Sequence, residues 1–487
     1  MVEGETVTPP ASGQPGLVRG LGLTAATSIN IANMIGTGVF LKTRVMTCNV
    51  DTPGMVLLVW VAAGLLALAG ALTYAELSAM KPAAGGDYVF IRDAFGRRWG
   101  FLFGWTQVSI ARTASQAAIA VGFAIFLNIL LGGALDGTFF TLNLFGHAVP
   151  FGSLQVVALG AIAVTTAINC GAVALSGAVA SWLTVVKIGV VAMVGLGALL
   201  FADGNWTHLF MSNDGGACEG VSAAARGGMA GFGAAMLGAL WAYDGWNNVA
   251  PLAAEVRNPQ RNMPRAFILG TVIVGALYVF ANLTYYYVLT PTEIASVSAS
   301  SSVATEVASR FLGAIAVTLM AIALMTSSFG SLHTSMMATA RFSYAMARDG
   351  LFFRKLGSVS PRTHVPVRSL IAQGVWSGVL ALSGSYDQLS DYAIFALWIF
   401  YGLATASVFV FRRRFPDAER PFRTPGYPIV PALFVLVTIW LVINTLITAP
   451  TQSLIGLAVI AAGLPLYAYF SRRKQASGEA GEPGSTS

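Results

Sequence analysis

Residues 33–40 read NMIGTGVF, and they lie inside an apolar stretch that is long enough to cross a membrane. Two glycines, Gly36 and Gly38, flank Thr37 there. Residues 238–248 read GALWAYDGWNN and interrupt a second apolar stretch with an aspartate, a glycine and two asparagines. Close helix packing through small residues would explain the first stretch alone, but an acid inside a membrane span usually lines a cavity or a pathway. Corresponding breaks in two halves of a chain predict the binding site of a transporter.

The composition places the chain in a membrane. Of the 487 residues, 55% are hydrophobic and only 10% are charged, whereas a soluble domain carries about 25% charged residues. The net charge of +7 does not indicate nucleic-acid binding, because the charges form short clusters between apolar runs. The first 16 residues are polar and do not resemble a signal peptide. The three cysteines have neither CxxC nor metal-ligand spacing, and no cofactor is expected.

The sequence predicts an all-α polytopic membrane protein with twelve transmembrane helices. Each needs about 20 mostly apolar residues. The long apolar region 151–201 contains a single charge, Lys187, and we divide it at Asn169-Cys170-Gly171. The helices are expected near residues 21–46, 54–80, 99–131, 151–170, 175–201, 227–250, 266–290, 311–340, 365–384, 389–411, 426–448 and 452–470.

The positive-inside rule favours this count. With a cytoplasmic N-terminus, most of the 28 Lys and Arg residues fall in cytoplasmic segments. We expect both termini to be cytoplasmic, residues 1–16 and 475–487 to be disordered, and the protein to reside in the cell (inner or plasma) membrane. Two basic residues fall within helices, Arg112 and Lys187, and those in outer segments are Lys42, Arg44, Arg226 and Arg310.

A broken helix offers both halves of a binding site for an α-amino acid. Amide N–H groups at the start of one half-helix carry partial positive charge and suit a carboxylate, and carbonyl groups at the end of the other half suit an ammonium. Such backbone is tolerated at this depth only beside protein or a wet cavity.

Four stretches in this order resemble the amino acid–polyamine–organocation superfamily and, within it, the L-amino-acid transporter family. The resemblance implies a leucine-transporter-like fold in which two inverted five-helix repeats are followed by two peripheral helices. The transport core would span residues 17–414, with repeats at 17–201 and 226–414, and helices 11 and 12 would lie in 415–474. The stretches are IGTGVF (35–40), TYAELSAMKPAAGGDYVFIRDAFG (73–96), WAYDGWNNV (241–249) with EVRNPQRNMPRA (255–266), and RPFRTPGYPIVPALFV (420–435).

The resemblance also implies roles for individual residues. The substrate carboxylate would meet the amides of Thr37 and Gly38, and the amine would meet carbonyls near Met34 and at Trp241 and Asp244. Trp241 would cover the substrate and Trp398 would line the pocket. The full set of implied substrate-binding residues is Met34, Ile35, Gly36, Thr37, Gly38, Trp241, Ala242, Tyr243, Asp244, Gly245 and Trp398.

Lys187 would take the place of a sodium ion in this family. Its ammonium would bridge the first helix to the Thr326-Ser327-Ser328 segment, with Ser327 and Ser328 as partners, and a snorkelling lysine is the alternative. Asp244 has two readings as well. Its carboxylate would either attract a cationic substrate side chain or cap local backbone and order water.

Four other polar residues stand apart from the expected substrate-binding set. Arg112 could be a buried functional charge, but a structural role is favoured because the family commonly tolerates a basic residue there. Glu76 and Asp87 are expected to form ion pairs with nearby Arg or Lys at the inner gate. The lone His333 is expected to be a hydrogen-bonded filler.

The positions of the cysteines indicate which disulfide bonds the chain could form, within itself or with another protein. Cys48 and Cys218 fall in outer loops and could form a disulfide in an oxidising compartment, although the sequence leaves this open. The loop 131–150 contains no cysteine, whereas animal members of the family use one there to bind a single-span glycoprotein. The resemblance therefore predicts a carrier without a disulfide-linked heavy-chain partner.

The expected function is secondary transport of L-amino acids by alternating access, as sodium-independent exchange or uniport. The alternatives are a proton-coupled symporter and a transporter-like amino-acid receptor. An enzyme is not expected, because HExxH, GxSxG and Walker A motifs are absent from the sequence. A channel is disfavoured because no filter or charged ring is evident.

Overall fold

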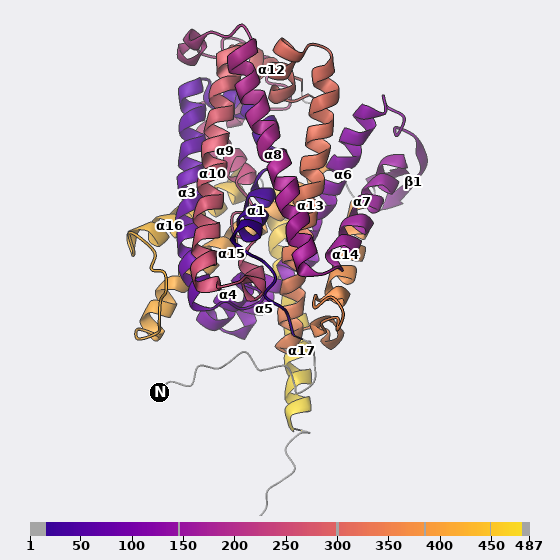
Figure 1. Ribbon diagram of the computed structural model, residues 1–487, viewed down its shortest axis with the longest axis vertical. Coiled ribbons are helices and arrows are strands. Elements are labelled where there is room, and N and C mark those ends of the chain that lie inside the picture. Colours follow the sequence, from indigo (N-terminus) through magenta and orange to yellow (C-terminus); the bar gives the residue numbers. More distant parts are fainter. Residues whose placement is uncertain (1–15, 145–146, 299–300, 384–385, 449, 480–487) are drawn as a thin grey trace, which may run out of the picture.

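The computed structural model describes residues 16–144, 147–298, 301–383, 386–448 and 450–479 (Figure 1). The segment 1–16, expected to be disordered, thus lies almost wholly outside the described residues. The other expected disordered segment, 475–487, begins inside a helix, because α17 (Pro450–Glu479) continues to Glu479.

Each of the twelve apolar stretches contains helix, and two of them are broken. Elements named η are 3-10 or π turns. In chain order the stretches correspond to α1 (Leu23–Met34) with α2 (Gly38–Val50); α3 (Pro53–Met80); α5 (Arg97–Thr106), the π turn η1 (Gln107–Ala111) and α6 (Arg112–Leu130); α7 (Ser153–Asn169); α8 (Val173–Phe201); α9 (Gly228–Ala242); α10 (Pro259–Val288); α13 (Ile315–Arg348); α14 (Val367–Ala381); α15 (Tyr386–Arg414); α16 (Ile429–Thr448); and α17.

Short elements connect these helices. The expected helical architecture is confirmed, and a short two-stranded antiparallel hairpin joins α6 to α7 within it. The hairpin pairs Thr138 with Gly152 and Leu144 with His147. The connecting elements are α4 (Asp87–Phe95), β1 (Thr138–Leu144), β2 (His147–Gly152), η2 (Trp206–Phe210), η3 (Ala223–Ala225), η4 (Ala250–Glu255), α11 (Pro291–Ser296), α12 (Val303–Leu312) and η5 (Arg354–Gly357).

The longest helices have the length and composition of membrane spans. Large apolar side chains on their outer faces, such as Leu65 on α3 and Val185 on α8, are exposed, as expected for surfaces that contact lipid. Among the described residues, eight segments meet this standard: Pro53–Met80, Arg97–Leu130, Val173–Phe201, Pro259–Val288, Ile315–Arg348, Phe395–Arg414, Ile429–Ile447 and Ser453–Arg473. The helices α7 and α9 are apolar but shorter.

The broken helix lies at the centre of the bundle. α1 packs against α8, α10 and α13, while α10 runs along α3 and α13 runs along α6. In Figure 1 the long helices α3, α10, α8 and α13 surround α1. α16 packs mainly on α15, and α16 and α17 are the least buried of the candidate spans.

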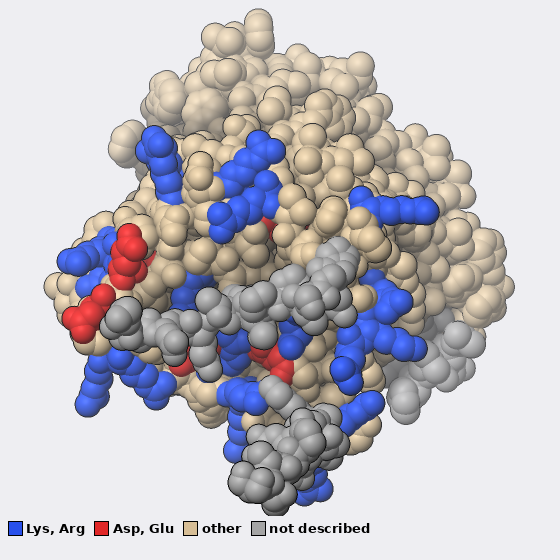
Figure 2. All heavy atoms as spheres, turned by 60° about the horizontal axis from the view of Figure 1, so that its bottom comes forward, with Lys and Arg blue, Asp and Glu red and all other residues tan. Residues whose placement is uncertain are grey.

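One face of the molecule is strongly basic. Lys and Arg side chains gather on the lower end of the bundle, from which α17 projects (Figures 1 and 2). At the opposite end, Cys48 at the end of α2 is disulfide-bonded to Cys218, with a Cα–Cα distance of 5.7 Å. This bond, which the sequence left open, joins α2 to the connection between α8 and α9.

Candidate functional site

The first crossing breaks where the glycines predict. α1 ends at Met34, Ile35 turns out of the helix with ψ 85°, and α2 begins at Gly38. Thr37 precedes the first turn of α2, and its side chain makes no capping hydrogen bond to that turn. The first N–H groups of a helix have no partner within the helix, so the start of α2 presents donors toward the gap.

The second crossing breaks opposite the first. α9 ends at Ala242, and the chain continues through turns at 243–249 into the 3-10 turn η4 rather than into a second α-helical half. Gly245 has φ 104°, and a Cβ there would lie 2.6 Å from the Cβ of Asn33. Only glycine therefore fits this approach of the two breaks. The Asn248 side chain donates to that of Asn33 at 2.9 Å.

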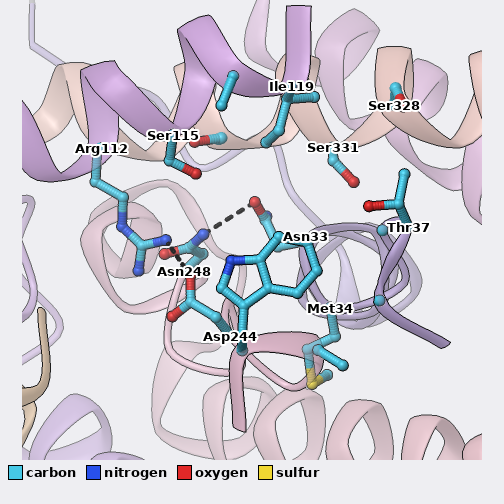
Figure 3. A pocket seen from close by; sticks show the side chains of 16 residues that line it. Asn33, Met34, Thr37, Arg112, Ser115, Ile119, Asp244, Asn248, Ser328 and Ser331 are labelled. Atoms are coloured by element: carbon cyan, nitrogen blue, oxygen red, sulfur yellow. Dashed lines mark hydrogen bonds and ion pairs between the residues drawn. The ribbon is translucent and has the colours of Figure 1, made fainter. Parts of the chain in front are cut away.

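A pocket lies between the two breaks and the helices α6 and α13 (Figure 3). It combines apolar and polar side chains with helix-end backbone, and its single acid and single base are Asp244 and Arg112. The lining residues are Asn33, Met34, Gly36, Thr37, Gly38, Arg112, Ser115, Ala118, Ile119, Trp241, Ala242, Asp244, Asn248, Ser328, Ser331 and Ser335.

Part of the expected substrate-binding set lines this pocket. The members that do so are Met34, Gly36, Thr37, Gly38, Trp241, Ala242 and Asp244, together with Ser328 from the expected ion-site set.

Four expected substrate-binding residues lie behind the pocket wall instead. The Tyr243 hydroxyl donates to the Trp60 carbonyl, and its ring packs against Trp60. Trp398 is 6% exposed and packs on Tyr401 and Phe434 rather than lining the pocket. The other two are Ile35 and Gly245, which contact Lys187 and Asn33.

The Met34 carbonyl already has a partner. The Tyr278 hydroxyl lies 2.7 Å from this oxygen and 3.0 Å from the Ala242 carbonyl oxygen, so its single proton is shared between the two acceptors. The expected contact between Met34 and a substrate amine therefore competes with a bond that ties the end of α1 to the end of α9.

Lys187 is buried against the end of α1. Its Nζ donates to the carbonyls of Ala32 at 2.6 Å and Ile35 at 2.7 Å, and to Ser331 Oγ at 2.7 Å. The side chain is 2% exposed, which excludes snorkelling to an aqueous interface.

The expected hydroxyl partners of Lys187 need correction. Ser327 Oγ donates to the same Ile35 carbonyl at 3.0 Å, but Ser328 lines the pocket. Thr326 donates to its own helix at Ile322. Because α-helical side chains share a face every three to four residues, Ser331, one turn after Ser327, takes the place expected for Ser328.

Arg112 lines the pocket, although a structural role was favoured for it over that of a buried functional charge. Its Nη1 lies 2.9 Å from Asp244 Oδ2, and Figure 3 shows the two side chains facing one another in the pocket wall. The π turn η1 immediately precedes Arg112. Such turns rotate the helix face and recur at functional sites, but no sequence pattern marked this one.

Sequence reasoning missed other lining residues for different reasons. Asn33 and Asn248 lie within the motifs that marked the breaks, so their position in the sequence could have identified them as lining residues. Ser115, Ala118 and Ile119 of α6 are ordinary residues for a packed membrane helix and carry no signal. The last missed residues are Ser331 and Ser335 of α13.

Ion pairs join the elements below the pocket. Arg341 binds Glu255 through two contacts of 2.8 Å, and both side chains are at most 1% exposed. Arg412 binds Glu76 at 2.7 and 2.9 Å, which confirms the expected pairing of Glu76.

Two other polar residues, Asp87 and His333, make hydrogen bonds. Asp87 accepts a hydrogen bond of 2.9 Å from the amide of Asn247, rather than pairing directly with the expected Arg or Lys. His333 contacts the Ser176 carbonyl at 3.0 Å and the Asn169 side chain at 3.2 Å, which agrees with a hydrogen-bonded filler. Among the described residues, no group of three or more His, Cys, Asp or Glu could hold a metal ion.

Comparison with known proteins gives matches over nearly the whole chain. The family model described as amino acid permease matches residues 21–467. The serine/threonine exchanger SteT of Bacillus subtilis (strain 168) is 31% identical over 461 residues, which cover 94% of this chain and 98% of SteT. The human b(0,+)-type amino acid transporter 1 is 30% identical over 460 residues, covering 94% and 89% of the two chains. The human large neutral amino acids transporter small subunit 2 is 29% identical over 469 residues, covering 95% and 83%.

Proposed function

Because the chain belongs to the amino acid permease family, we propose that it exchanges L-amino acids across a cell membrane by alternating access and without sodium. Family membership makes it a membrane transporter rather than an enzyme. The observation that carries the proposal is the meeting of two helix breaks at one pocket, since Asn248 after α9 binds Asn33 at the end of α1.

A zwitterion fits the polarity of these breaks. The substrate carboxylate would bind the amides of Thr37 and Gly38 at the start of α2, where the helix dipole favours negative charge. The amine would bind carbonyls of the turn that begins at Trp241 and passes Asp244. Lys42 Nζ lies 4.7 Å from the centre of the Trp241 ring, and this cation–π contact supports Trp241 as a cover over the pocket.

The helix arrangement supports twelve crossings in two inverted five-helix repeats with two peripheral helices. Both breaks fall in the first crossing of their repeat, as in transporters built from inverted repeats. The low burial of α16 and α17 supports their peripheral position.

Sodium independence rests on Lys187. Its ammonium donates to the Ala32 and Ile35 carbonyls and to Ser331, groups that would otherwise suit a hard cation. A charge fixed in the chain would hold the end of α1 to α13 without a coupling ion.

The charge distribution supports cytoplasmic termini. The basic face in Figure 2 would then meet the cytoplasm, as the positive-inside rule expects. The disulfide Cys48–Cys218 occupies both outer cysteines, and Cys170 follows α7 near the basic end. No outer thiol would remain for a covalent heavy-chain partner, so the carrier is proposed to work without a disulfide-linked heavy chain.

Counterflow in proteoliposomes tests this function. Vesicles loaded with an unlabelled amino acid should accumulate the labelled one from outside, with sodium present or absent and with no pH gradient. Accumulation only under an imposed pH gradient would instead identify a proton symporter. Binding without any counterflow would identify a receptor.

A further inference from the structure

The pocket wall contains a paired acid and base. Asp244 is the single acid among the lining residues, and its side chain is 24% exposed. Both of its oxygens are engaged, Oδ2 by Arg112 Nη1 at 2.9 Å and Oδ1 by the Tyr401 hydroxyl at 2.6 Å. A substrate side chain thus meets a carboxylate that already has its partners.

Arg112 is held as firmly as its partner. It is 4% exposed, and its second terminal nitrogen donates to the Tyr401 hydroxyl and to Asn247 Oδ1. Guanidinium stays protonated in proteins, so the charge persists in the pocket. The planar donor fork binds Asp244, Tyr401 and Asn247 together, a geometry that lysine would not reproduce.

A second acid lies behind the pair and does not reach the pocket. Asp87 is fully buried and is joined to Arg112 through Asn247, which donates to it at 2.9 Å. Burial raises the pKa of Asp87, while the hydrogen bond from Asn247 lowers it. Because Asp87 does not line the pocket, the Arg112–Asp244 pair supplies the charges of this wall.

From these contacts we infer that Arg112 makes the pocket selective for amino acids with uncharged side chains, by neutralising Asp244. The inference rests on the proposed function. Arg112, Asp244 and a zwitterion sum to no net charge. A lysine substrate adds a cation whose only acidic partner in the wall is already bound, and a glutamate substrate adds an anion that must draw Arg112 away from Asp244. Leaving either charge unpaired at this depth is costly.

The test compares charge variants in proteoliposomes. Counterflow of leucine, lysine and glutamate is measured for the wild type, Arg112→Gln, Asp244→Asn, the double variant and Tyr401→Phe. Arg112→Gln should raise the ratio of lysine to leucine counterflow at least about tenfold, which corresponds to about 1.4 kcal/mol. Asp244→Asn should raise the ratio of glutamate to leucine counterflow similarly.

The matched variants separate the effect of side-chain charge on the counterflow ratios from the effect of side-chain shape. The double variant removes both charges and should disfavour lysine and glutamate again, to the level of the wild type. Tyr401→Phe removes a hydroxyl that contacts both residues but keeps both charges, and it should leave the two ratios unchanged.

Each outcome decides between the alternatives. Unchanged ratios in Arg112→Gln, or lysine counterflow equal to leucine counterflow in the wild type, would overturn the inference. If Arg112→Gln does not fold, an unchanged glutamate ratio in Asp244→Asn has the same effect. If the folded wild type moves no amino acid, the proposed function itself fails. If the wild type exchanges leucine but the variants leave both ratios unaltered, only the inference about Arg112 fails.

Discussion

The Nζ atom of Lys187 lies 2.7 Å from the carbonyl oxygen of Ile35. Ile35 is the residue at which α1 leaves its helical path, so α8, which carries Lys187, holds the first break. The same nitrogen reaches Ser331 of α13. One cation thus joins three elements that must stay aligned for the pocket to keep its shape.

Lys187→Ala should reduce exchange at least about tenfold, which corresponds to about 1.4 kcal/mol, because it removes the group that holds the end of α1 to α13 and leaves the carbonyls of Ala32 and Ile35 with only the hydroxyls of Ser331 and Ser327 as donors. Gly189→Ala on the same helix is the control, since a Cβ there meets nothing within 4 Å. The measurements are counterflow and folded yield by size-exclusion chromatography. Equal loss of yield and exchange in Lys187→Ala would reduce its role to folding.

Gly38→Ala should abolish binding. The added Cβ would lie 2.5 Å from the Cβ and 2.8 Å from the Cα of Ala242, so α2 would have to move away from α9 and displace the amides that hold the carboxylate. Gly160→Ala on α7, with nothing within 4 Å, is the control. Substrate-induced thermal stabilisation checks the result, and a normal shift in Gly38→Ala would remove the start of α2 from the site.

Glu255→Gln should open the basic end of the transporter. It breaks a pair whose side chains are 0% and 1% exposed, and breaking such a pair typically costs about 3–5 kcal/mol. A cysteine placed at Ser335, in a Cys170→Ser background, should react faster with an impermeant thiol reagent applied from the cytoplasmic side.

Arg310→Gln provides the comparison for this gate. The Arg310–Glu293 pair is 52% and 46% exposed, and exposed pairs contribute about 0–1 kcal/mol. Its labelling rate should match that of the parent. Equal rates for Glu255→Gln and the parent would show that the buried pair does not hold the gate.

Reduction of the Cys48–Cys218 disulfide should lower the thermal midpoint of the protein. The cysteines are 170 residues apart, and closing a loop of that size stabilises by up to about 5 kcal/mol in the chain-entropy model. Thiol titration of the unfolded chain should give one thiol without reductant and three with it. Cys170→Ser should keep the midpoint, and a titre of three thiols before reduction would contradict the bond.

The sequence was informative wherever a residue conflicts with an apolar helix. Gly36 and Gly38 predicted the first break, and Asp244 and Gly245 predicted the second, because such residues are costly in a membrane span unless backbone or cavity requires them. Lys187 was found by the same conflict. The apolar stretches located the helices, but the hairpin β1–β2 was missed, since it lies in a connection.

Side-chain partners were less accessible to sequence reasoning. The pairing of Arg112 with Asp244 was not predicted, because the two residues lie 132 positions apart in the chain and no residue pattern signals the turn η1 beside Arg112. Trp398 and Tyr243 lie behind the pocket wall, and whether an aromatic residue on a helix faces ligand or neighbour depends on rotation and packing. The shift from Ser328 to Ser331 as the partner of Lys187 has the same cause, since these serines lie about one turn apart.

The most direct test of the account is a structure determined with a transported amino acid bound in the pocket. The account predicts its carboxylate against the amides of Thr37 and Gly38, its ammonium against carbonyls of the turn after α9, and both crossings broken. A ligand bound elsewhere, with α1 and α2 joined as one regular helix, would contradict it.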